Sequence, residues 1–200
     1  MERIKEGFGE YMYKYQITKL EKLIKVMESS DIGRPDMRKV FRDAWGRQFW
    51  YNPVMLIRLF NNVDSLPEHT DQEKAQMSDS ANKISKIAEE ALSRCGDYMP
   101  MPTIDEVKAY VKSCKSDMSS EGCIWAFSKI GPFVNARHLL DVMQVFPDTR
   151  FAKPENNVSA VYFHSEDGDG VLMPIRPQFA MSKNYGITQE AIDKDEEGVW

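Results

Sequence analysis

Basic and aromatic side chains alternate between residues 34 and 58 in a way that suits nucleic-acid binding. The segment holds six basic residues against two acidic ones, with five aromatic residues between them. Basic side chains hold phosphates, and exposed aromatic rings stack on unpaired bases. We therefore predict a nucleic-acid-binding site in this segment. Its candidate residues are Arg34, Arg38, Lys39, Arg42 and Arg47, and Arg58 completes the basic set.

The same segment also has a purely structural interpretation. If it forms a helix, Phe41, Trp45 and Phe49 share one buried face, where they cannot stack on bases. Arg38 and Arg42 then lie one turn apart on another face and form a solvated ridge. The spacing of the residues is compatible with either role.

The sequence SEDGDG at residues 165–170 contains two carboxylates that invite comparison with a metal-binding loop. A calcium-binding EF-hand loop needs a longer run of alternating oxygen ligands and a glutamate at its twelfth position. Both are missing here, so we predict that this segment is the tight turn of a β-hairpin and holds no metal.

The histidines and cysteines offer little for catalysis. Cys123 with His138 or His164 would suit nucleophilic chemistry only if the side chains met in a cleft, and no local motif supports that arrangement. A buried structural cysteine is the more common case. His69 lies in a polar segment, where we expect it to be solvated. We predict no catalytic residue and no cofactor.

Composition and charge narrow the class of protein. The three cysteines form no CxxC pair, and an odd number fits no complete disulfide framework. The first residues lack the apolar core of a signal peptide, and no apolar run approaches the roughly 20 residues that span a bilayer. We expect a cytoplasmic protein with reduced thiols and no membrane partner. Acidic and basic residues balance over 1–120, so the net charge of -5 belongs to residues 121–200.

Helical periodicity dominates the first part of the chain. We predict helices over residues 1–30, from residue 36 to about 49, over 54–60, over 84–92 and over 103–114. The last of these begins with Thr103 as its N-cap, and Glu106 completes a capping box. Residues 115–122 are polar and separate this helical region from a part that contains β-strands.

The second part of the chain alternates short strands with one helix. We predict a strand over 123–128, a helix capped by Asn135, and a hairpin of strands 158–164 and 170–176 around SEDGDG. The expected fold class is therefore α+β. We expect a helical domain at 1–118, a βαββ unit at 119–178 and an acidic tail at 179–200.

The βαββ unit resembles the closing portion of the bacterial DNA polymerase III β sliding clamp. In the helix, the matching residues are Asn135, Leu140, Asp141 and Val142; in the final strand they are Val171, Met173, Pro174 and Arg176. The similarity covers about a quarter of the chain. It implies a clamp-like packing in which the final strand lies as an edge strand against the leucine face of the helix.

In the sliding clamp family, this final strand forms one wall of the hydrophobic pocket that receives partner peptides. The resemblance therefore implies a protein-binding role for Val171, Met173, Pro174 and Ile175. Clamps also encircle DNA with helices that present basic residues. Here Arg137 is offset by Asp141 on the corresponding helix, so its charge largely cancels.

The leading hypothesis is a non-enzymatic protein-interaction module of DNA metabolism, such as a replication or recombination accessory carried by a phage or another mobile element. Its partner would be a replication or nuclease protein, with DNA as a weaker second partner. The alternative is an anti-CRISPR-like inhibitor that blocks a host nuclease or defence complex by surface or DNA mimicry. The acidic tail motivates this alternative, because clustered carboxylates can occupy a groove built for phosphates.

Overall fold

Helices and antiparallel strands are combined in the computed structural model, which describes residues 14–29, 34–43, 45–76, 86, 97–114, 123–156 and 159–176. The strands are β1 (Phe41–Arg42), β2 (Gln48–Tyr51), β3 (Met55–Leu59), β4 (Ile124–Ala126), β5 (Phe133–Asn135), β6 (Arg150–Ala152), β7 (Val161–His164) and β8 (Gly168–Leu172). The helices are α1 (Lys14–Glu28), the 3-10 turn η1 (Pro35–Met37), α2 (Asp71–Gln76), α4 (Ile104–Ser113) and α5 (Ala136–Val145). The predicted α+β class is confirmed.

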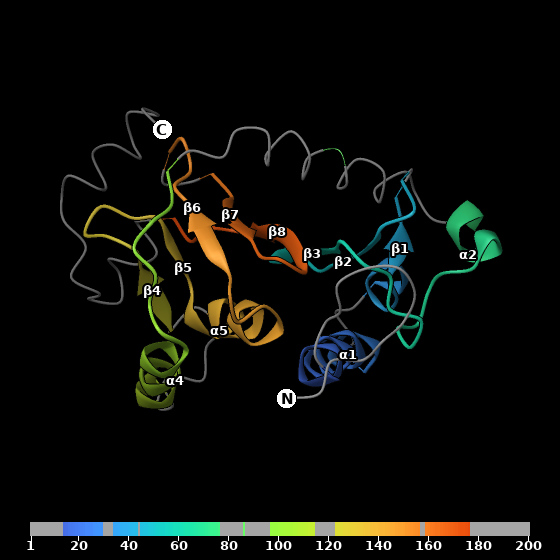
Figure 1. The fold of residues 1–200 in the computed structure, drawn as a ribbon, viewed down its shortest axis with the longest axis horizontal. Helices are drawn as coiled ribbons and strands as arrows, with labels where there is room; N and C mark the ends of the chain where they lie inside the picture. The colour runs from blue at the N-terminus through green and yellow to red at the C-terminus, as the bar shows by residue number, and fades with distance from the viewer. Residues whose placement is uncertain are drawn as a thin grey trace.

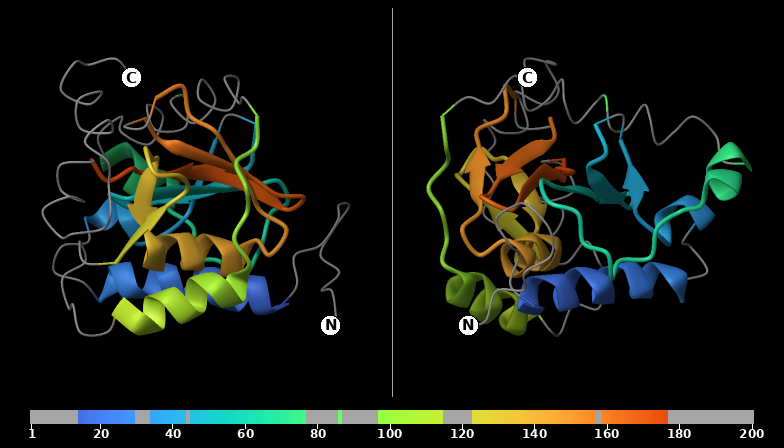
Figure 2. Two further views of the ribbon diagram at one scale, coloured as in Figure 1. Left: turned by 90° about the vertical axis from the view of Figure 1, so that its left-hand side faces the viewer. Right: turned by 45° about the vertical axis from the view of Figure 1, so that its right-hand side comes forward.

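Six of these strands form one antiparallel sheet in the order β1-β2-β3-β8-β7-β6, while β4 and β5 form a separate pair. The helices α1, α4 and α5 lie together on one side of the large sheet (Figures 1 and 2). Their apolar faces meet the sheet in a core that joins Leu20 of α1 and Leu139 of α5 to Ile57, Phe163 and Leu172 of the strands. None of the helices in the described ranges is long and apolar enough to cross a membrane.

Local sequence signals predicted the helices α1, α4 and α5 correctly. Thr103 caps α4 by accepting the N–H of Glu106, and the Glu106 carboxylate accepts the N–H of Thr103 in return, which completes the expected capping box. Asn135 caps α5 through a 2.9 Å hydrogen bond from the N–H of Arg137 to Oδ1. The predicted strand at 123–128 is confirmed as β4, and the predicted hairpin is confirmed as β7–β8. Its turn is shorter than SEDGDG, because only residues 165–167 lie between the strands and residues 168–170 already belong to β8. The predicted helix at 84–92, apart from Lys86, and the acidic tail lie outside the described residues.

The prediction of helices between residues 36 and 60 was wrong, because this segment forms β1, β2 and β3. Phe41 pairs with Phe49 across the β1–β2 hairpin, so side chains eight residues apart meet on a sheet instead of along a helix. Asp43 and Gly46 make the turn, with Gly46 at a φ of 79° that favours glycine. Trp45 lies in this turn and is 67% exposed, not buried with Phe41 and Phe49 as the helical interpretation required.

The large sheet also crosses the domain boundary that the sequence suggested near residue 118. β3 from the first part pairs along its whole length with β8 from the second. β8 therefore lies between β3 and β7 and is not the edge strand that the clamp resemblance implied. The approach is close at Gly170, where a Cβ atom would collide with the carbonyl oxygen of Leu56 and the ring of Phe163.

Candidate functional site

The basic segment predicted to bind nucleic acid lies around the β1–β2 hairpin, and most of its charges are paired with carboxylates. The described pairs are Arg34–Asp36, Lys39–Glu73, Arg42–Glu68, Arg47–Asp43 and Arg58–Asp169, with nitrogen–oxygen distances of 2.6–3.2 Å. Arg38, the remaining candidate, is half-buried beside this hairpin. Phosphates would have to compete with these internal partners for the same guanidinium and ammonium groups.

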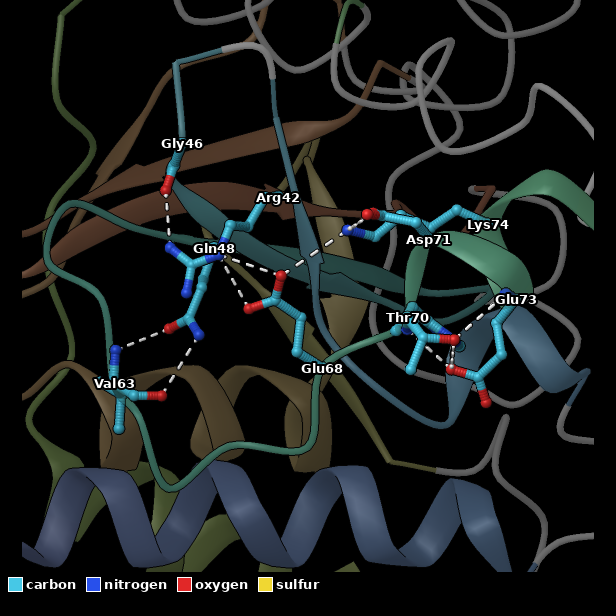
Figure 3. Close-up of polar contacts among 10 residues, drawn as sticks. Arg42, Gly46, Gln48, Val63, Glu68, Thr70, Asp71, Glu73 and Lys74 are labelled. Atoms are coloured by element: carbon cyan, nitrogen blue, oxygen red, sulfur yellow. Dashed lines mark hydrogen bonds and ion pairs between the residues drawn. The ribbon is translucent and has the colours of Figure 1, made fainter.

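Residues 67–69 bring the acidic partner of Arg42 into place. The N–H of Val40 donates to the carbonyl of Pro67 at 2.8 Å, and the N–H of His69 donates to the carbonyl of Val40 at 3.0 Å. Glu68 therefore lies beside β1, where both of its carboxylate oxygens accept from Nε of Arg42 at 2.9 and 3.0 Å. Figure 3 shows this pair, with Glu68 between Arg42 and Lys74.

Hydrogen bonds to the acids hold this network together, and they keep Glu73 in its ionised form. A hydrogen bond from Lys39, 2.7 Å long, lowers the pKa of Glu73 to about 2, and the backbone N–H of Thr70 adds to the effect. Asp43 accepts the N–H groups of Trp45 and Arg47 at 2.9 Å each, and its second oxygen accepts from Nε of Arg47 at 2.6 Å. In both pairs a carboxylate lies within hydrogen-bonding distance of its cation, so the local field that would attract a phosphate is small.

The residues that the clamp resemblance assigned to a peptide pocket do not form one wall. Val171 is buried against Phe41 and Leu56 on the face of the sheet opposite α5. Met173 is 50% exposed, whereas Pro174 and Ile175 are half-buried. The N–H of Ile175 donates to the carbonyl of Phe133 at 2.7 Å, so this residue extends the small sheet beside β5.

A different apolar surface surrounds Trp125 on β4. Two shallow hollows of about 330 and 220 Å³ flank this half-buried ring, and both are lined by Trp125 and Ala126. Pro100, Met101, Pro102, Glu106 and Phe127 complete the first hollow, and Tyr110, Ile124 and Phe133 complete the second. The Trp125 surface, as we call these residues together, is thus formed by the 100–102 segment, α4 and the small sheet.

Tyr110 fixes the position of Trp125 from the side of α4. Its hydroxyl donates to the carbonyl of Ile124 at 2.6 Å, and its ring meets the Trp125 ring edge-on with centroids 5.5 Å apart. The contact joins α4 to β4 across the second hollow. The hollow therefore has a defined shape in the folded chain.

The outer edge of β4 presents backbone groups next to both hollows. The β4–β5 ladder includes bonds from the N–H of Ala136 to Cys123 and from the N–H of Phe127 to Pro132. Since hydrogen-bonded pairs alternate along an antiparallel ladder, the N–H and C=O of Ala126 point away from β5. Among the described residues β4 pairs with β5 alone, and the 100–102 segment lies beside this edge without forming a strand pair with it.

Sequence reasoning missed this surface although it predicted its parts. The predicted strand at 123–128 supplies Trp125, Ala126 and Phe127, and Pro100 and Pro102 lie in the other part of the surface. Nothing in the local pattern indicated that the two would lie side by side. That proximity depends on the hydrogen bond from the N–H of Met99 to the carbonyl of Phe151, 2.8 Å long, which fixes the 97–102 segment beside β6.

The histidines and acids considered for chemistry are dispersed over several elements. His138 faces Asp141 on α5 at 3.9 Å, while the ring of His164 lies 5.7 Å from that of Phe60. Asp169 lies in β8, not in the turn, and pairs with Arg58 of the neighbouring strand β3. In the described part of the chain, no group of three or more His, Cys, Asp or Glu side chains has the geometry to hold a metal ion.

His69 differs from the expectation of a solvated side chain. It is 3% exposed, and its ring lies 4.4 Å from that of Phe41. Burial lowers the pKa of His69, although the nearby Glu73 acts in the opposite direction. The polar residues around it in the sequence hid this position, because it is the pairing of residues 67–69 with Val40 that places the imidazole inside.

In comparisons with known proteins, no family model, no curated protein and no solved structure matches the chain. The function is therefore inferred from the geometry described above.

Proposed function

We propose that this chain is a non-enzymatic protein-interaction module, and that its Trp125 surface receives an extended apolar segment of a partner protein. The observation that carries the proposal is the pair of hollows on either side of Trp125, along an outer strand edge. Tryptophan is one of the residues that most often dominate binding energy when they lie near the centre of an interface.

An extended peptide fits this surface better than a helix or a small molecule. Ala126 offers one outward N–H and one outward C=O, which a peptide strand would pair by adding itself to the β4–β5 sheet. Side chains of a bound strand would then alternate, and those facing the molecule would enter the hollows. The hollows are open and shallow, whereas small-molecule sites enclose most of their ligand.

The charge at the rim favours a basic residue in the partner segment. Glu106 lines the larger hollow, and hydrogen bonds from the backbone and side chain of Thr103 lower the pKa of its carboxyl. The carboxylate is therefore ionised at neutral pH. A lysine or arginine beside the apolar anchor of the peptide would complement it.

A role in replication or recombination rests on the resemblance of the βαββ unit to the sliding clamp. In the proposed module, the Trp125 surface replaces the pocket wall that the resemblance assigned to the final strand, because Val171 is buried. Nucleic-acid binding by the basic segment is the weaker candidate, since its cations already have internal carboxylate partners.

The test is selection of peptides from a random displayed library against the full chain, followed by affinity measurements on the selected sequences. Replacing Trp125 with Ala should weaken their binding by more than about tenfold, as truncation of a central aromatic anchor does. Trp45→Ala is the matched control, because Trp45 is exposed on the β1–β2 turn at the other end of the sheet (Figure 1). Equal binding by the Trp125 and Trp45 variants would contradict the proposal.

A second variant separates loss of binding from loss of folding. Ala126→Pro removes the outward N–H that an added strand would use but leaves the bonds to β5 in place. We expect it to weaken the same peptides while circular dichroism still shows the wild-type fold. Ala126→Ser keeps the donor and adds little volume beside the hollows, so it should retain the binding that Ala126→Pro loses.

A further inference from the structure

Two cysteines meet where α4 ends and β4 begins. Cys114 is the C-cap residue of α4 and is half-buried, and Cys123 directly precedes β4 and is completely buried. Both are free thiols, and their side chains lie in hydrogen-bonding contact. They are nine positions apart in the sequence, so their contact is a product of the fold.

The backbone around both thiols is fixed by residues of the Trp125 surface. The N–H of Cys114 donates to the carbonyl of Tyr110, one helical turn earlier. The hydroxyl of Tyr110 donates to the carbonyl of Ile124, the residue after Cys123. The carbonyl of Cys123 accepts the N–H of Ala136 at 2.8 Å. The dithiol and the smaller hollow therefore share the same supports.

The surroundings give the two thiols different roles. Burial raises the pKa of Cys123 to about 12, and the neighbouring Cys114 adds to the rise, while Arg137 acts in the opposite direction. Cys123 is thus protonated and shielded at neutral pH. Cys114 is the more accessible thiol and meets a dissolved oxidant first.

We propose that Cys114 and Cys123 form a reversible disulfide by exchange with a small dissolved disulfide of the glutathione class, and that this bond regulates the Trp125 surface. The Cys114 thiolate attacks one sulfur of the small disulfide and releases one small thiolate. Cys123 then gives its proton to the released small thiolate and attacks the Cys114 sulfur, which releases the second small thiolate. The protein dithiol is oxidised by two electrons, and one small disulfide is reduced to two thiols.

The regulatory part rests on the proposed docking function. A covalent bond holds the two sulfurs closer than a thiol contact does. The bond shifts the last turn of α4 relative to β4, and the 2.6 Å contact between Tyr110 and Ile124 must adjust to that shift. These two residues line the smaller hollow, so oxidation changes its shape and weakens the binding of an apolar side chain there.

The disulfide itself is tested by mapping thiols in the full chain, with no need for a binding partner. After incubation with oxidised glutathione, proteolysis and mass spectrometry should find residues 114 and 123 joined, with the loss of two hydrogens. Cys95→Ser is the matched control and should form the same bond, and Cys114→Ser should form none. Stable glutathione adducts on Cys114, or a bond that involves Cys95, would overturn the proposal.

The regulation is tested with the peptides selected against the reduced protein. We expect oxidation to weaken their binding by about fivefold or more, and a reductant to restore it. The Cys114→Ser variant should bind equally under both conditions. A mapped disulfide with unchanged affinity would overturn the regulatory step. If no peptide is selected, the docking function fails, whereas the mapping result still decides the disulfide.

Discussion

His69 is the residue whose surroundings depart most from its sequence context. It lies in a polar stretch, yet its imidazole is buried against Phe41, and neither ring nitrogen has a hydrogen-bond partner among the described residues. Its nearest carboxylate is Glu73, with Oε2 3.7 Å from Nδ1. Lys39 shares Glu73 and opposes a positive charge on the imidazole. The neutral form is therefore favoured in the folded chain.

This burial predicts a pH dependence of stability. Because the pKa of His69 is lower in the folded state than its unfolded value of 6.5, the unfolded chain binds the extra proton more readily. The neutral His69 side chain therefore contributes fully to the free energy of unfolding well above pH 6.5. That contribution is lost as the pH falls below this value. Thermal unfolding of wild type and His69→Phe between pH 7.5 and 5 should show a smaller decrease in Tm for the variant.

The control for this prediction is His138→Phe, since His138 is partly exposed on α5. It should keep the pH profile of the wild type. An identical decrease in Tm for wild type and His69→Phe would show that the buried imidazole does not carry the effect.

At the scale of elements, the junction of β3 with β8 ties the two parts of the chain together. Arg58 and Asp169 face each other in the register of the two strands and form a bidentate pair with distances of 2.7 and 2.8 Å. Both side chains are 5% exposed. A buried pair of this kind is costly to break, because removal of one partner leaves the other charge without compensation in a medium of low polarity.

We therefore expect Asp169→Asn to destabilise the fold by about 3–5 kcal/mol in chemical unfolding. The matched surface pair is Arg42–Glu68, whose side chains are 35% and 27% exposed. Glu68→Gln should cost no more than about 1 kcal/mol, because water screens that pair. A similar small loss for both variants would mean that the β3–β8 pair is not shielded from solvent.

At the scale of the whole molecule, the continuous sheet opposes a division near residue 118. The β8 strand takes one set of its hydrogen bonds from β3 and the other from β7. Leu20 and Ile24 of α1 also belong to the same core as Leu139 and Val145 of α5. Separating the chain at residue 118 would expose the edge of β8 that pairs with β3, and it would also expose this core.

The fragment of residues 119–178 should consequently fail to fold alone. We expect poor dispersion in its amide NMR spectrum and no cooperative thermal transition, whereas the full chain unfolds cooperatively. A folded fragment with a cooperative transition would restore the predicted βαββ unit as an independent domain.

The amino-acid sequence alone determined those features that depend on near neighbours. The spacing of Leu20 and Ile24, the capping box of Thr103 and the Asn135 cap act within about one helical turn, and the three helices that they predict, α1, α4 and α5, are present. The spacing of Phe41 and Phe49 did not decide between helix and sheet. Eight residues bring two side chains to one face of a helix and also to opposite strands of a hairpin.

Only the tertiary structure decided which distant groups meet. Arg58 and Asp169 are 111 positions apart, and the edge of β4 lies beside the 100–102 segment through contacts that no local pattern specifies. Charges that suggest a phosphate site in the sequence are matched by acids from another part of the chain. Helix periodicity is local, whereas strand pairing, ion pairing and surface hollows arise from the packing of the whole chain, which is why the candidate site emerged only in three dimensions.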